Sequence, residues 1–78
     1  MLEELLLYLG QSLVNDPASV RVCSRAGENG IVVYEMRVDG AEMGRVIGKH
    51  GRIAKAIRSV MKAAANRTGQ KIQVEIAE

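Results

Sequence analysis

The sequence predicts an α+β fold in which three helices pack on one face of a three-stranded mixed sheet. Apolar residues recur at helical spacing near residue 2 and again after residue 52, and they alternate with polar residues in three other segments. A chain of 78 residues has room for one hydrophobic core. We therefore expect a single domain over residues 1–78 with the element order α-β-β-α-α-β.

Residues 2 to about 14 are predicted to form an amphipathic helix. Its apolar face consists of leucines at positions 2, 5, 6, 9 and 13. The helix should end at Asn15-Asp16-Pro17, because proline disfavours helical backbone in the residue before it.

Two strands joined by a tight turn are predicted next. Residues 19–25 and 31–38 both alternate, with Val20 and Val22 on one face of the first strand. Between them lies Asn29-Gly30, a hairpin signal because both residue types accept positive φ.

The second half of the chain predicts two helices and a last strand. A short helix over 41–47 precedes a long helix from about Arg52 to Arg67, and residues 72–76 alternate as a strand. The apolar stripe of the long helix is expected at Ile53, Ile57, Val60, Met61 and Ala64. A two-helix connection is long enough for a right-handed crossover, which makes the second and third strands parallel neighbours.

Charge is distributed unevenly along the chain. Residues 43–74 contain eight basic residues and no acid, whereas most acids precede them. The basic residues are Arg45, Lys49, Arg52, Lys55, Arg58, Lys62, Arg67 and Lys71. Such a run is either a solvated basic surface or the footprint of a polyanionic partner.

The cysteine and histidine content excludes several site types. One cysteine and one histidine allow neither an internal disulfide nor a zinc site built by this chain alone, so no metal or other cofactor is expected. No segment reaches the roughly 18–20 apolar residues of a membrane span, and the start has no basic segment typical of a signal peptide. We expect a cytoplasmic protein without a membrane partner.

The segment Gly48-Lys49-His50-Gly51 is the candidate functional loop. Its glycines permit positive φ and a close approach of another backbone, and the next helix directs its free N–H groups at the loop. A phosphate suits this place, with Lys49, Arg52 and His50 around it. A P-loop is excluded because three residues rather than four separate Gly44 from Gly48, and no Ser or Thr follows Lys49. A Rossmann fingerprint is excluded because its first paired glycines are missing.

The segment Val46 to Ile53, with the sequence VIGKHGRI, resembles the signature of KH domains, whose GXXG loop clamps the backbone of four nucleotides. The element order is similar to that of the type II, prokaryotic KH domain. The chain as a whole resembles the short stand-alone bacterial KH proteins of the KhpA family, in its length, its Leu-rich first helix and its run GRIAKAIR from Gly51 to Arg58.

This resemblance implies a groove between the two central helices and an adjacent strand, floored by aliphatic side chains. The candidates for its floor are Val46, Ile47, Ile53, Ala54 and Ile57, with Val38 on the strand side. The alternative is that they are core residues, which we favour for Ile57, whereas Ile47 and Ile53 beside the loop can serve both roles. Lys49 and Arg52 are expected to meet phosphates. Arg45, Lys55 and Arg58 either join them or face solvent.

The aromatic content supports this mode of binding over other modes. Tyr8 and Tyr34 are the only aromatic residues, too few for the base-stacking platforms of an RNA-recognition motif or an OB-fold. The prediction is a non-catalytic protein that binds single-stranded RNA, since no acid–base pair or nucleophile motif is visible.

Two alternatives remain open: single-stranded DNA as the ligand, and a protein-interaction or dimerisation module that uses Leu7 and Tyr8. The resemblance further implies a role as an RNA chaperone in cell-envelope and cell-shape control. It also implies a homodimer, or a heterodimer with a larger multidomain KH-containing protein.

Overall fold

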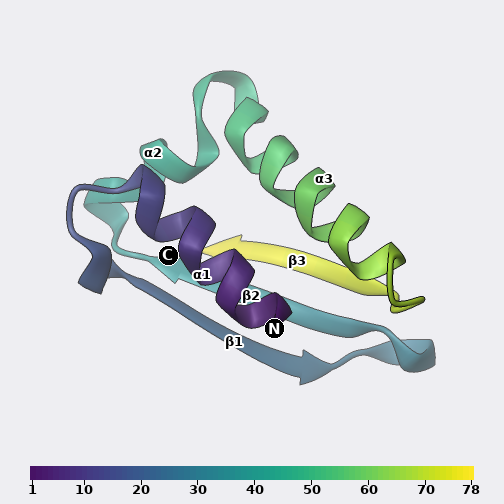
Figure 1. Ribbon diagram of the computed structural model, residues 1–78. Helices are drawn as coiled ribbons and strands as arrows, with labels where there is room; N and C mark the ends of the chain where they lie inside the picture. The colour runs from purple at the N-terminus through teal and green to yellow at the C-terminus, as the bar shows by residue number, and fades with distance from the viewer.

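A computed structural model describes residues 1–78 and confirms the predicted element order (Figure 1). The helices are α1 (Leu2–Leu13), α2 (Met43–Ile47) and α3 (Arg52–Asn66). The strands are β1 (Val20–Ala26), β2 (Val32–Val38) and β3 (Ile72–Ala77). None of the three helices combines the length and apolar character that crossing a bilayer requires.

The sheet is mixed, as predicted, with the order β1-β2-β3. Strands β1 and β2 pair antiparallel from Val20↔Val38 to Ala26↔Val32, and β2 and β3 pair parallel. At the hairpin, Asn29 and Gly30 have φ of 57° and 79°, which confirms the turn signal. Both β1 and β3 are therefore edge strands, and one edge of β3 has no strand partner.

All three helices cover the same face of the sheet (Figure 1). The core between the two layers contains Leu6 from α1, Val46 from α2, Ile57 and Met61 from α3, and Val20, Tyr34, Met36, Val38 and Val74 from the strands. Helix α1 approaches the sheet most closely at Gly10, where a Cβ atom would lie 2.5 Å from the Met36 sulfur. A glycine within this helix is explained by that contact.

The buried stripe of α3 differs from the predicted one. Ala54, Ile57, Met61 and Ala65 are buried, whereas Val60 is 46% exposed. The apolar residues of α3 form two overlapping stripes. The stripe that contains Ala54 and Ala65 faces the sheet, because small side chains let the helix approach the sheet closely. Val60 and Ile53 are left on the side of α3 that faces α1.

The segment before α2 also differs from the prediction. Gly40–Glu42 form a 3-10 turn, and α2 starts only at Met43. The Glu42 carboxylate accepts hydrogen bonds from the backbone N–H groups of Asn15 (2.6 Å) and Asp16 (3.1 Å) and from the Ser19 hydroxyl (3.0 Å). These bonds, chiefly the one from Asn15, lower the pKa of Glu42. Glu42 thus fixes the end of α1 to the start of α2.

We predict that Glu42→Gln destabilises the protein at neutral pH and flattens its acid denaturation. Because the pKa of Glu42 is lowered in the folded state, its bonds stabilise the fold above the ordinary value of 4.5, and this stabilisation is lost as pH falls below that value. Urea denaturation of the wild type and the variant between pH 3 and pH 7 measures this difference.

Glu28→Gln is the matched control, since Glu28 is exposed in the hairpin and its carboxylate has no hydrogen-bond or ion-pair partner. Equal pH profiles for the two variants would contradict the assignment.

Candidate nucleic-acid interface

The loop Gly48–Gly51 joins α2 to α3 through left-handed backbone. The φ angles of Gly48, His50 and Gly51 are 76°, 58° and 72°. The Gly48 N–H donates to the Gly44 carbonyl (2.9 Å), and the Gly51 N–H donates to the Gly48 carbonyl (3.2 Å). These bonds close α2 and redirect the chain, so the loop projects between the two helices (Figure 1).

Gly48 is required for two independent reasons. Its φ of 76° with ψ of 173° lies in a region essentially reserved for glycine. A Cβ atom at this position would also lie 2.6 Å from Cγ1 of Ile53. The Ile53 side chain therefore packs directly on the loop backbone and holds the loop against the first turn of α3.

The N-terminus of α3 is open at this loop. Its N-cap residue is Gly51, no side chain caps it, and its first turn contains no acid. Lys49, His50 and Arg52 are exposed around it. The Arg52 N–H donates to the Lys49 carbonyl. The positive end of the helix dipole and the three basic side chains together form a place suited to an anion such as a phosphate.

Most basic side chains near the loop have no acidic partner. Lys49, Arg52, Lys55 and Lys62 are exposed and form no ion pair. Arg45 is the exception, with Nε 3.8 Å from the Glu42 carboxylate. The unpaired charges follow α3 away from the loop and are available to a polyanion.

A groove of about 500 Å³ runs between α3 and β3. Arg58 and Lys62 line it from the helix, and residues 73–77 line it from the strand. The Arg58 Nε donates to the Val74 carbonyl (3.3 Å), which shows that the unpaired edge of β3 faces this groove. Apart from the Val74 carbonyl, the backbone groups on this edge have no strand partner and can bind the polar edges of bases.

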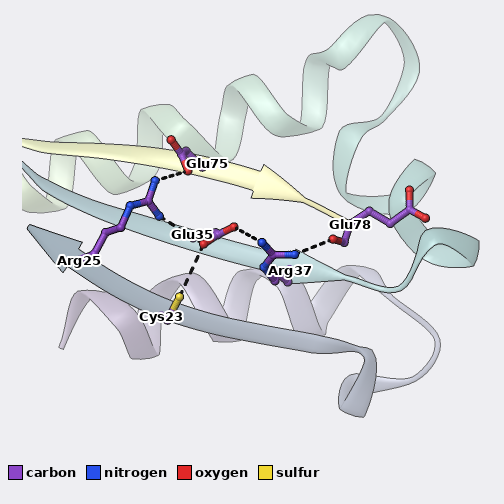
Figure 2. A network of polar contacts seen from close by, with 6 residues as sticks. All are labelled: Cys23, Arg25, Glu35, Arg37, Glu75 and Glu78. Carbon is purple, nitrogen blue, oxygen red and sulfur yellow. Dashed lines mark hydrogen bonds and ion pairs between the residues drawn. The ribbon is translucent and has the colours of Figure 1, made fainter. Parts of the chain in front are cut away.

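The acids beside β3 are engaged on the opposite face of the sheet (Figure 2). Arg25 lies 2.8 Å from Glu75 and 3.3 Å from Glu35, and Arg37 lies 3.1 Å from Glu35. The hydrogen bond that Arg25 donates to the Glu75 carboxylate raises the pKa of Arg25. The Glu75 carboxylate is thus paired with Arg25, and Arg58 and Lys62 on the other side of the groove form no ion pair with it.

Most of the predicted site residues lie either at the loop or elsewhere along α2 and α3. Gly48, Lys49, His50, Gly51 and Arg52 form the loop and the start of α3, and Ile47 and Ile53 are half-buried beside them. Arg45, Lys55 and Arg58 are exposed, while Val46 and Ala54 are buried.

Four of the six candidates for the groove floor lie in the core: Val38, Val46, Ala54 and Ile57. Ile57 is 4% exposed and Val38 is 2% exposed. The expectation of Val38 on the strand side of the groove needs correction, because β3 rather than β2 borders the groove. Sequence reasoning missed Lys62 and the β3 residues. The predicted strand order already indicated the β3 residues, because the third strand of a β1-β2-β3 sheet has a free edge at which a ligand can bind.

Comparison with known proteins agrees with this geometry. The model of the family described as "KhpA/KhpB, KH domain" matches residues 3–76. The chain belongs to this family. RNA-binding protein KhpA of Clostridium perfringens is 48% identical over 96% of this chain and 99% of its own length. RNA-binding protein KhpA of Treponema pallidum is 40% identical over 100% of this chain and 96% of its own length.

A solved structure shares the fold. Era in complex with MgGDPNP and nucleotides 1506–1542 of 16S ribosomal RNA matches with a TM-score of 0.64 at 21% identity. The match covers 97% of this chain and 29% of Era. The type II KH fold predicted for this chain is therefore confirmed.

We predict that Gly48→Ala destabilises the protein more than Gly51→Ala. Alanine at position 51 meets only the cost of positive φ, about 1 kcal/mol, since no atom lies within 4 Å of its Cβ. Alanine at position 48 meets two costs: a less favourable backbone region and a steric clash of its Cβ with Ile53. Together they should lower the free energy of unfolding by about 3 kcal/mol. Urea denaturation measures both values, and equal losses would contradict the packing of Ile53 on the loop.

Proposed function

We propose that this chain binds single-stranded RNA as one unit over residues 1–78, without catalysis. The RNA backbone lies at Gly48–Gly51 and its bases lie in the groove between α3 and β3. One observation carries this proposal: α3 has an uncapped N-terminus, carries cations without an ion pair, and forms one wall of an open groove whose other wall is an edge strand. The names of the KhpA relatives, all RNA-binding proteins, support it.

We further propose a cytoplasmic role as an RNA chaperone or post-transcriptional regulator, together with a larger KH-containing protein, in cell-envelope and cell-shape control. The support is the family itself, whose description joins KhpA and KhpB. A small site with few phosphate contacts binds weakly, so a second RNA-binding partner would raise the avidity for a shared RNA.

Replacing Lys49 and His50 with Asp should abolish most RNA binding, because two carboxylates would repel the phosphate at the start of α3. For the wild type we expect a slope of log K against log salt of roughly −2 to −3, from three or four phosphate contacts on a single strand. Fluorescence anisotropy with single-stranded RNA and DNA of the same sequence measures affinity, slope and sugar preference.

Arg21→Asp with Ala18→Asp is the control, because it changes the net charge equally at exposed residues remote from the loop. Unchanged RNA binding by the folded loop variant, or equal losses in both variants, would contradict the proposed clamp. Tighter binding of DNA than of RNA would favour single-stranded DNA as the ligand.

A second candidate function is pairing with another copy of this chain. A hollow of about 420 Å³ between α1 and α3 is lined mainly by apolar residues, including Leu9, Leu13 and Ile53. Tyr8 and Val60 on its rim are 66% and 46% exposed. Burying this surface against the same surface of a second copy would form a symmetric dimer.

Val60→Glu should convert such a dimer to a monomer, because burying one unpaired charge costs on the order of 3 kcal/mol. Sedimentation equilibrium measures the change, with Ser59→Glu, an adjacent exposed position outside the hollow, as the control. A wild-type protein that is monomeric at high concentration would exclude this function, as would a dimer unaffected by Val60→Glu.

A further inference from the structure

The groove between α3 and β3 continues beyond the part described above. A second hollow of about 190 Å³ lies at the far end of α3 and is lined by Lys62, Ala65, Asn66, Gln70, Lys71 and Ile72. Lys62 lines both hollows, and on the strand side Ile72 of the second is followed by Gln73 of the first. The two hollows are therefore neighbours, and together they form a channel along the second half of α3, from Arg58 to Asn66.

The side chains of the second hollow are suited to a nucleotide. Lys62 and Lys71 are exposed cations without an ion pair. The side-chain amides of Asn66 and Gln70 form no hydrogen bond within the protein, so both their donors and their acceptors are free. Ile72 is half-buried and lines the same hollow with an apolar side chain.

The backbone of this hollow is held in place. The Gln70 N–H donates to the Ala65 carbonyl (3.0 Å), and the Lys71 carbonyl accepts from the Val32 N–H (3.1 Å). These bonds tie the turn after α3 to the helix on one side and to β2 on the other. The backbone of Gln70 and Lys71 is thus fixed beside the channel. Less conformational entropy is therefore lost at these residues when a ligand binds.

We propose that this hollow is an additional nucleotide subsite, which binds a phosphate with Lys62 and Lys71 and a base with Asn66 and Gln70. The inference rests on the proposed RNA binding at Gly48–Gly51. A GXXG loop accounts for about four nucleotides, and the subsite would lengthen the RNA that this chain binds beyond them.

The test compares single-stranded RNAs of four and eight nucleotides, both of randomised sequence. NMR titration detects the weak binding of the short RNA, and anisotropy over a range of salt concentrations follows the long one. Lys71→Gln should leave the affinity for four nucleotides unchanged and weaken binding of eight nucleotides several-fold. It should also reduce the magnitude of the salt slope for the long RNA by about 0.7, the value of one phosphate contact.

Arg67→Gln is the matched control, because it removes the same charge at the same end of α3 from a residue that does not line the subsite. Arg67 lines the hollow beside Leu2 and Tyr34, which shares only Gln70 with the subsite. Equal effects of Lys71→Gln and Arg67→Gln, equal effects on the two RNA lengths, or no effect of Lys71→Gln would overturn the subsite. Each of these results would leave the proposed RNA binding at Gly48–Gly51 in place, provided that the variant with Lys49→Asp and His50→Asp loses RNA binding. If that variant binds normally, the proposed function fails instead.

Discussion

The contact between Ile53 and the backbone of Gly48 is the constraint on which the candidate nucleic-acid interface depends. Helix α2 is only five residues long. The chain has to turn sharply after it so that the N-terminus of α3 stays accessible to a ligand. Left-handed backbone at Gly48 and Gly51 makes this possible, and the Ile53 side chain fills the space where a Cβ of Gly48 would lie. The result is a helix N-terminus that is fixed in position and still open to a ligand.

The separation of charge between the two faces of the sheet follows from the alternation of its strands. On the open face, Arg25, Arg37, Glu35 and Glu75 compensate one another (Figure 2). On the helix side, the cations of α3 have no acid within reach. A polyanion is therefore attracted to one side of the molecule, the side where the loop and the groove lie.

Sequence patterns predicted the fold well because the periodicities of α1, β2 and α3 are long and the crossover rule leaves one arrangement of the strands. The loop was also predictable, since few structures require glycine at both Gly48 and Gly51. The groove was not. Ile57 belongs to the predicted stripe and to the observed one, and it is buried against the sheet, whereas Lys62 lines the groove. Val38 was misplaced for a different reason, since the groove borders β3 and not β2.

Mapping a bound single-stranded RNA on the protein by NMR chemical-shift perturbation tests the central claim most directly. The account predicts that the largest shifts occur at residues 48–52 and 73–77, with small shifts at Arg21 and Cys23 on the open face of the sheet. Shifts confined to the open face, or to Tyr8 and Val60 between α1 and α3, would contradict it.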